Sequence, residues 1–211
     1  MHIAYISMKI LAAFFLGIII FWIIQYAHLR WVFVPSLREP KMKDLHNNLY
    51  QLTFDILATL RAQTPEPKVW AIGGTMLGAA RDGKIIPWDD DADFAYMTED
   101  RAIIEAIDWA SIGATVKVTL GVEWLGFQVH RNGVYVDLFE FENIEDQKVH
   151  YKGHGKLFWG KQFFLREEVT NLRMVPFGNS LIPVAHSYKP YLDRSFSAHW
   201  QTHGKIVPPH M

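Results

Sequence analysis

A pair of glycines and a dense group of aspartates stand within one short stretch of this chain. Asp89, Asp91 and Asp93 alternate with other residues, so in an extended segment their side chains would share one face. Carboxylates at this spacing repel one another unless a cation lies among them. Gly73 and Gly74 precede them and offer backbone amides that a phosphate can approach closely. The pattern predicts a divalent-metal site beside a phosphate-binding turn, a combination suited to phosphoryl or nucleotidyl transfer.

Acidic runs are more often solvated surface than a site, and the flanking residues decide between the two. Trp88 and Phe94 bracket this run, and Ile85, Ile86 and Pro87 precede it. Charges placed at the boundary of an apolar core need a partner. The context therefore favours a functional cluster.

Two common motifs fit this stretch only in part. The aspartates match the first, third and fifth positions of a calcium-binding EF-hand loop, but its required glycine is Phe94 and its bidentate glutamate is Asp100. Gly78 to Lys84 has the spacing of a Walker A loop, but the hydroxyl residue that must follow is Ile85. Both interpretations are rejected.

The run Gly-Gly-Thr-Met-Leu-Gly-Ala-Ala-Arg, followed by Ile-Ile-Pro-Trp-Asp-Asp-Asp-Ala-Asp, resembles the signature of the LicD family. That family includes bacterial phosphocholine transferases and the eukaryotic fukutin-related proteins, and the resemblance covers most of residues 69 to 97. A weaker similarity lies in residues 176–183, in Tyr191-Leu192 and in His199-Trp200. Relatives often have Tyr-Gly-x-Asp-Trp where this chain has Phe-Ser-Ala-His-Trp, so the acceptor side departs from the family pattern.

The resemblance implies an α+β nucleotidyltransferase-like fold, in which a small mixed sheet flanked by helices carries the glycine turn, an Asp-x-Asp pair and a third acid on another strand. Residues 124–130 and 134–141 are two β-rich runs, and the Asn132-Gly133 pair between them is a strong hairpin signal. Asp137 lies inside the second run, where burial and strand propensity disfavour an aspartate. We expect Asp137 to be the third carboxylate, with a solvent-facing strand residue as the alternative.

The resemblance also assigns roles to the acids. Asp91, Asp93 and Asp137 would hold one or two Mg²⁺ (or Mn²⁺) ions that stabilise charge on the leaving nucleotide. Either Asp137 or Asp89 would act as the base for the acceptor hydroxyl.

The residues around the glycine turn would hold the donor's phosphates. The amides of Gly73 and Gly74, and Thr75 at the start of the following helix, are predicted to contact phosphate oxygens. Arg81 is predicted either to add a bidentate phosphate contact or to form a salt bridge with a neighbouring aspartate, Asp82 or Asp89.

By resemblance, the donor is a CDP-alcohol such as CDP-choline or CDP-ribitol, and the acceptor is a sugar hydroxyl of a glycan or glycolipid. An NTP-dependent nucleotidyltransferase is the alternative enzyme, and a catalytically silent membrane-anchored scaffold of the same fold is the alternative outside catalysis. Trp124, Tyr135 and Trp159 are candidate aromatic surfaces for a quaternary ammonium, but core packing is the favoured role for each.

The composition narrows the classes of partner. The chain has 211 residues, half of them hydrophobic, which predicts one globular domain and additional apolar sequence outside it. Its 21 basic residues balance 22 acidic ones, which argues against nucleic-acid binding. The absence of cysteine excludes disulfides and zinc-thiolate sites and leaves the cellular compartment open.

The additional apolar sequence is at the N-terminus. No charged residue occurs from Ile10 to Ala27, a length that suits a bilayer-crossing helix of about 20 residues. A cleavable signal peptide is the alternative, but Gln-Tyr-Ala-His is a poor cleavage site. The predicted organisation is a signal-anchor in residues 1–34, a stem in 35–42 and the catalytic domain in 43–211.

The predicted location is a membrane with one span. The resemblance to fukutin-like proteins implies a type II Golgi or ER enzyme, whereas the resemblance to bacterial LicD implies the cytoplasmic face of the inner membrane. Basic residues follow the span, which nominally keeps the domain in the cytoplasm, but this rule is weak for a large domain after a first span.

Periodicity predicts the remaining elements. Apolar residues from Leu45 to Leu60 recur at helical spacing, and a strand is expected at residues 69–72. A helix is expected to start near Thr98 and to bury Ile103, Ile104, Ile107 and Ala110, with a strand at residues 115–120 after it. The histidine pairs at 150/154 and 199/203 are read as coincidence rather than zinc sites, and Lys152, Lys156 and Lys161 as surface rather than a phosphate-covering lid.

Overall fold

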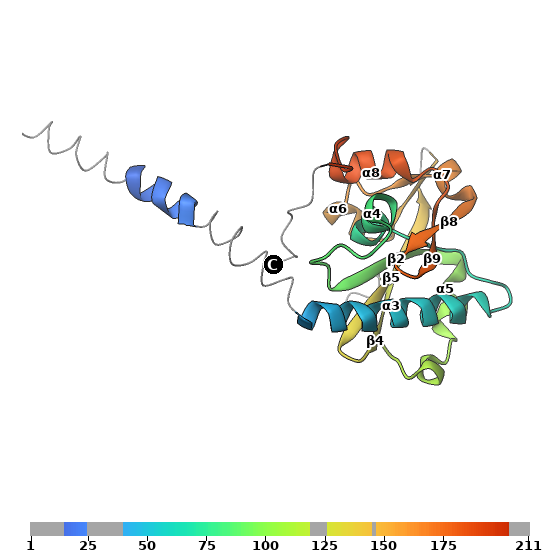
Figure 1. Ribbon diagram of the computed structural model, residues 1–211. Coiled ribbons are helices and arrows are strands. Elements are labelled where there is room, and N and C mark those ends of the chain that lie inside the picture. The colour runs from blue at the N-terminus through green and yellow to red at the C-terminus, as the bar shows by residue number, and fades with distance from the viewer. Residues whose placement is uncertain (1–14, 25–39, 119–125, 145–146, 203–211) are drawn as a thin grey trace, which may run out of the picture. The chain divides into compact units, whose positions relative to one another are not determined.

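The computed structural model describes residues 15–24, 40–118, 126–144 and 147–202. The chain divides into two units, Met1–Pro40 and Lys41–Met211. The second unit is an α+β domain with a mixed sheet, a separate two-stranded hairpin and helices (Figure 1). The predicted fold class is confirmed at this level.

The helices of the domain are α3 (Pro40–Arg61), α4 (Gly73–Asp82), α5 (Arg101–Glu105), α6 (Gly155–Phe158), α7 (Arg166–Thr170) and α8 (Tyr188–Phe196), with 3₁₀ turns η2 (Thr98–Asp100) and η3 (Trp109–Ile112). The strands are β1 (Val69–Ala71), β2 (Asp91–Met97), β3 (Thr115–Val118), β4 (Gly126–Arg131), β5 (Val134–Ile144), β6 (Lys148–Tyr151), β7 (Phe164–Leu165), β8 (Leu172–Phe177) and β9 (Ser180–Ala185).

The main sheet has the order β1-β2-β5-β4-β3, and β6 joins the far half of β5 and pairs with β7. β2 and β5 are parallel, whereas the other pairs are antiparallel. The parallel register places Asp93 directly beside Asp137. The prediction that the strand of the Asp-x-Asp pair lies next to the strand of Asp137 is therefore confirmed.

The hairpin between β4 and β5 forms where the sequence predicts it. Asn132 and Gly133 form its two-residue loop, with φ angles of 52° and 79°. Two successive positive φ angles match the twist of the flanking strands and explain why asparagine and glycine stand here. This turn fixes the register of β4 against β5.

α3 covers the sheet with the apolar stripe that its periodicity predicts. Leu49, Leu52, Ile56 and Leu60 are fully or almost fully buried. The helix begins at Pro40, where a missing N–H costs nothing, so residues 40–42 of the predicted stem are helical. In Figure 1, α4 and α8 lie together on the other side of strands β2 and β5 from α3.

The helix expected from Thr98 is shorter than predicted. η2 leads into α5, which ends at Glu105, and a new 3₁₀ turn begins after Asp108. The Asp108 carboxylate accepts a hydrogen bond from the Ala110 amide and so starts that turn. Ile104 and Ile107 are buried, but Ala110 is exposed, contrary to the prediction.

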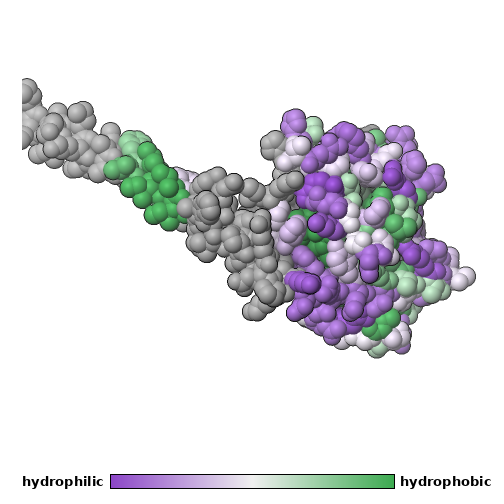
Figure 2. All heavy atoms as spheres, viewed as in Figure 1, coloured by the Kyte–Doolittle hydropathy of each residue, from purple (hydrophilic) through white to green (hydrophobic). Residues whose placement is uncertain are grey.

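Residues 15–24 are helical and expose large apolar side chains along their length. Figure 2 shows these residues as a hydrophobic surface. Among the described residues, no helix reaches the length and apolar character that crossing a bilayer requires. The predicted span, 10–27, lies in part outside the described residues.

Candidate active site

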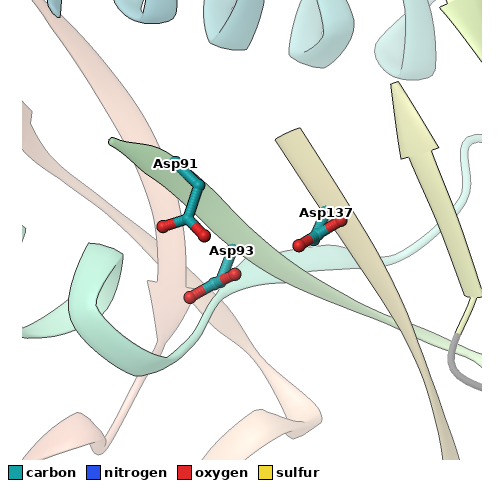
Figure 3. Close-up of side chains that lie close together, drawn as sticks. All are labelled: Asp91, Asp93 and Asp137. Atoms are coloured by element: carbon teal, nitrogen blue, oxygen red, sulfur yellow. The ribbon is translucent and has the colours of Figure 1, made fainter. Parts of the chain in front are cut away.

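Three carboxylates meet where β2 and β5 run side by side. Asp91 and Asp93 project from one face of β2, and Asp137 projects toward them from β5 (Figure 3). Each offers an oxygen, and these three atoms lie within 4.8 Å of one another. Within the described residues this is the one group of three such side chains that could hold a metal ion. The three residues predicted as metal ligands are therefore brought together.

Asp137 is held by its neighbour across the hairpin. Its side chain is 9 % exposed, and its Oδ1 accepts a hydrogen bond of 2.9 Å from Nε2 of Gln128 on β4. Gln128 stands directly opposite Asp137 in the register. This single neutral donor orients the carboxylate without neutralising its charge.

The β2 acids are positioned by groups on α4 and β5. The hydroxyl of Thr75 accepts a 2.8 Å hydrogen bond from the backbone N–H of Asp93, which ties the first turn of α4 to β2. The hydroxyl of Tyr135 lies 3.4 Å from Oδ2 of Asp91 and donates to it. Thr75, predicted to contact phosphate, thus also anchors the strand that carries the acids.

Asp89 lies outside the trio. The strand begins only at Asp91, so Asp89 does not share its face as the alternating pattern predicts. Its carboxylate lies against Gly74, where an added Cβ would come within 2.5 Å of Oδ2. A ring nitrogen of His46 on α3 hydrogen-bonds the Asp89 carbonyl at 2.8 Å. Asp89 therefore borders the site from the N-terminal end of α4.

Gly73 opens α4 with a φ of +54° and lies against Asp93, whose Oδ2 would be 2.9 Å from an added Cβ. Its amide donates a 3.0 Å hydrogen bond to the hydroxyl of Tyr191 on α8. Tyr191 is fully buried and stacks face to face on Phe164 at 4.1 Å. This amide, predicted to bind phosphate, is thus engaged by the protein itself.

The acids of the cluster hold protons unusually tightly. Burial, with repulsion from Asp91 and Asp90, raises the pKa of Asp89 to about 7. Burial also raises the pKa of Asp137 to about 7, against the opposing hydrogen bond from Gln128. Burial and the charges of the neighbouring acids raise the pKa of Asp93 well above its usual range. A cation among these acids would offset both the cost of burying their charges and the repulsion between them.

The donor chemistry fits a hard divalent cation. Carboxylate oxygens are the ligands that Mg²⁺ and Mn²⁺ prefer. Among the described residues, no lysine or arginine forms an ion pair with Asp93 or Asp137. Asp93 and Asp137 therefore have the composition and charge expected of metal ligands.

The basic residues that the sequence singled out form ion pairs with nearby acids or lie on the surface. Arg81 pairs with Asp82, one of the two alternatives that the sequence left open, at 2.7 Å. Lys152 and Lys156 bind Glu140 and Glu142 of β5. Lys161 is exposed, as a surface residue is expected to be.

The aromatic and histidine candidates have structural contacts or lie outside the described residues. Trp159 stacks on Tyr151, with ring centroids 4.7 Å apart. His150 is buried on β6, and no histidine joins a metal-binding group in the described part of the chain. Trp124 and His203 are outside the described residues.

Sequence reasoning missed the residues that position the acids. Gln128 was detectable, because a two-residue loop at Asn132-Gly133 sets residue 128 opposite residue 137 by counting alone. The contacts of Tyr191 and His46 had no local signal, since they join elements far apart in the sequence.

Residues 67–186 match the family described as LicD/FKTN/FKRP, nucleotidyltransferase domain, which is more than half of the chain. The chain belongs to the LicD family. The Asp-x-Asp pair, the third acid and both glycines lie inside this matched region.

Individual relatives share about a third of the aligned residues. The ribitol 5-phosphate transferase FKRP of Mus musculus is 30% identical over 139 residues, which cover 61% of this chain and 27% of that protein, and the Homo sapiens protein gives the same proportions. An uncharacterized protein of Rickettsia typhi is 30% identical over 172 residues, 77% of this chain and 50% of that protein. The chain thus spans half or less of these curated relatives.

Among solved structures, the solution structure of the antibiotic-resistance factor ANT(2'')-Ia is similar to this chain. The TM-score is 0.46 at 16% sequence identity, and the superposition covers 78% of each chain.

Proposed function

We propose that this chain is a metal-dependent transferase that moves a phospho-alcohol from a CDP-alcohol to a sugar hydroxyl of a glycan or glycolipid. The observation that carries the proposal is the meeting of Asp91, Asp93 and Asp137 across the parallel β2–β5 pair of a LicD-family domain. The similarity to two proteins named ribitol 5-phosphate transferase makes ribitol phosphate the first group to test.

The three carboxylates would hold Mg²⁺ or Mn²⁺, which supplies charge neutralisation at the donor's phosphates. Gln128 and Thr75 keep Asp137 and the β2 backbone in place, so the ligand set is pre-formed. Residues held by their neighbours in this way pay little ordering cost when substrate binds.

Asp89 is the proposed general base. Its carboxylate stands beside the three acids rather than among them, at the start of α4. It would accept the proton of the acceptor hydroxyl as that oxygen forms a bond to the phosphorus bearing the alcohol. The bond from this phosphorus to the bridging oxygen breaks, and CMP leaves. The first turn of α4, with Gly74 and Thr75, would orient the donor's phosphates at its positive end.

Product analysis tests the proposal directly. The protein would be incubated with Mg²⁺, a sugar acceptor and each of CDP-ribitol, CDP-choline and CTP. Release of CMP from a CDP-alcohol supports the proposal, whereas pyrophosphate released from CTP indicates a nucleotidyltransferase. If Mg²⁺ binds but no donor reacts, the sugar supplied is not the acceptor of this protein. The catalytically silent scaffold is indicated by an absence of both Mg²⁺ binding and turnover.

We further propose that the N-terminal segment anchors the protein in a bilayer. The support is the exposed apolar surface of residues 15–24, which contains no charged side chain. After extraction with alkaline carbonate, the full chain should stay in the membrane pellet, and a chain starting at Pro40 should stay in the supernatant. Equal solubility of the two would contradict the anchor. The compartment, whether the Golgi or ER lumen or the bacterial cytoplasmic face, is to be read from protease protection of the same membranes.

A further inference from the structure

One large apolar side chain of the domain projects far into solvent, on a loop beside the aspartate site. Leu157 of α6 is 75 % exposed, a larger fraction than any other large apolar residue among those the structure describes. The apolar residues of the N-terminal segment 15–24 reach 66 % at most. The loop that carries Leu157 shows why this side chain points outward.

The α6 loop, residues 152–162, packs one side of its single helical turn against β6. Gly155 lies against Tyr151, where an added Cβ would come within 2.7 Å of the tyrosine Cβ. Trp159 stacks on the same tyrosine, with ring centroids 4.7 Å apart. Residues four apart share a face of a helix, so Gly155 and Trp159 face inward and Leu157, midway between them, faces solvent.

The base of the α6 loop is attached to residues around the aspartates. Trp159 packs edge to face on Phe139, with ring centroids 5.8 Å apart. Phe139 follows Asp137 by two positions and so shares its face of β5. At the end of the loop, Oε1 of Gln162 accepts a 3.4 Å hydrogen bond from the hydroxyl of Tyr191. The tip of the loop therefore has a fixed place next to the aspartate site.

The chain around this tip is cationic. Residues 147–166 contain five lysines and arginines and no aspartate or glutamate. Lys152 and Lys156 pair with acids of β5, whereas Lys161 and Arg166 are exposed. An apolar tip accompanied by exposed cations is typical of segments that lie in the interface of a bilayer, with the apolar side chain among the acyl chains and the cations at anionic headgroups.

A protein partner fits this surface less well. A stable protein interface buries about 800 Å² on each side and has an apolar core. The other strongly exposed large apolar residues in the described part of the domain, Val116, Met174 and Leu181, lie on β3, β8 and β9. One protruding leucine cannot form such a core, whereas a fluid acyl layer accommodates a single side chain without a matching pocket.

The chain also gives the domain a reason to meet a bilayer. Residues 15–24 belong to the proposed anchor, and the chain enters the domain through α3. His46, in the second turn of α3, hydrogen-bonds the carbonyl of Asp89 beside the aspartate site. In Figure 1, α6 and the first turns of α3 lie at the same side of the domain. A tether raises the effective concentration of the loop at the bilayer, so a weak contact becomes populated.

We propose that the α6 loop inserts Leu157 into the headgroup boundary of a bilayer that contains anionic lipids, and so holds the aspartate site at the membrane surface. This contact is separate from the proposed anchor and does not require the transfer reaction. Its test therefore needs no turnover.

Site-specific fluorescence tests the proposal, because the chain contains no cysteine and a single one can be introduced. The full chain would be reconstituted in vesicles of phosphatidylcholine and phosphatidylglycerol, with an NBD fluorophore on Leu157→Cys. Nitroxides on the lipid acyl chains should reduce its emission at least about twofold. The matched control is Met174→Cys, an exposed apolar position that contacts Arg61 at the last residue of α3 and should not be quenched. Ile19→Cys reports on the anchor independently.

A second arm keeps the leucine in place, since the fluorophore is itself apolar. A label on Lys156→Cys should also be quenched, and adding Leu157→Ser should reduce that quenching at least about threefold.

The outcomes separate the alternatives. A label at Leu157→Cys that is quenched no more than one at Met174→Cys overturns the proposal, whatever Ile19→Cys reports. A blue-shifted emission at Leu157→Cys without nitroxide quenching also overturns it and indicates a protein contact, such as a second copy of the chain. Quenching in a protein that releases no CMP from any CDP-alcohol would contradict the proposed function and leave this contact in place.

Discussion

Two buried carboxylates stand three residues apart on β5 and face opposite sides of the sheet. Glu140 is 1 % exposed and accepts hydrogen bonds from Lys152, Thr98 and Arg101. Although burial opposes it, these donors lower the pKa of Glu140 below its usual value. Asp137 has one neutral donor and two acidic neighbours, and burial raises its pKa to about 7. Cations of the protein thus pair with the charge of Glu140, whereas Asp137 has only a neutral donor.

The difference separates a structural carboxylate from a proposed metal ligand. The protein supplies Glu140 with two cations and two hydroxyls, so that acid has its full set of partners without any added group. The acids around Asp137 raise one another's proton affinity, which is costly unless a cation joins them. The comparison predicts opposite behaviour when each acid is neutralised.

Asp93→Asn should produce the largest effect. Loss of one of three ligands should reduce transfer by at least about a hundredfold, because the bound metal is misplaced. Stability without metal should stay the same or rise, since one of several repelling acids is gone. Rates of CMP release and urea unfolding measure the two quantities, with Glu99→Gln as the surface control. A variant that unfolds while its folded fraction keeps full specific activity would make the cluster structural.

Glu140→Gln should do the reverse. Arg101 and Lys152 lose their buried partner but remain partly exposed, so we expect a loss of about 2–3 kcal/mol in the free energy of unfolding. Mg²⁺ affinity measured by calorimetry should not change. Glu142→Gln, on the same strand and paired only with Lys156, should cost less than about 1 kcal/mol. Equal losses for Glu140→Gln and Glu142→Gln would remove the contrast.

The pH dependence of stability should differ in sign between the two groups. The pKa values of Asp89 and Asp137 lie near 7 in the folded protein, against 3.8 as the reference, so the folded state binds more protons and stability falls as pH rises between these values. In EDTA, the free energy of unfolding should fall by at least about 2 kcal/mol from pH 5 to pH 8.

Two additions sharpen this test. Mg²⁺ should flatten the slope above pH 5, because it takes the place of the protons. Glu140, whose pKa is lowered, contributes stability that is lost only as pH falls through the acidic range, so Glu140→Gln should change the slope of stability against pH only in that range, beside its loss of stability at higher pH. Stability that does not vary with pH in EDTA would argue against strongly coupled acids.

Tyr191→Phe should have the smallest effect. The ring and its stacking on Phe164 remain, but the Gly73 amide loses its acceptor. We expect about tenfold slower transfer and weaker Mn²⁺ binding, with a stability loss of about 1 kcal/mol. Tyr50→Phe removes a similar acceptor from the Ile85 amide and should cost stability without changing Mn²⁺ affinity. Identical Mn²⁺ affinities for Tyr191→Phe and the wild type would assign Tyr191 to packing alone.

Local rules predicted much of the site. The Asn132-Gly133 pair fixed a hairpin, and an aspartate inside an apolar strand pointed to Asp137. The adjacency of β2 and β5 came from the family resemblance, because no local pattern pairs strands that are separated by more than 30 residues. The sequence predicts each strand, whereas the tertiary fold determines which strands pair.

The misses have a common physical cause. Asp89 was expected on the strand face, but the chain turns before Asp91, so its position depends on contacts with Gly74 and His46. Tyr191 reaches Gly73 across 118 positions of sequence. For Arg81 the sequence left a phosphate contact and a salt bridge open, and the structure has the ion pair with Asp82. Contacts between distant elements are what a single sequence leaves undetermined.

The parallel pairing of β2 with β5 also has a consequence for the rate at which the chain folds. Asp93 and Asp137 are register partners, so closing this long loop brings like charges together in the same step that forms the centre of the sheet. Above pH 7 and without metal, refolding should be slowed by that repulsion. A divalent cation at the proposed site should then shorten the refolding time, so that the supply of the ion would set how fast newly made chains reach the native state.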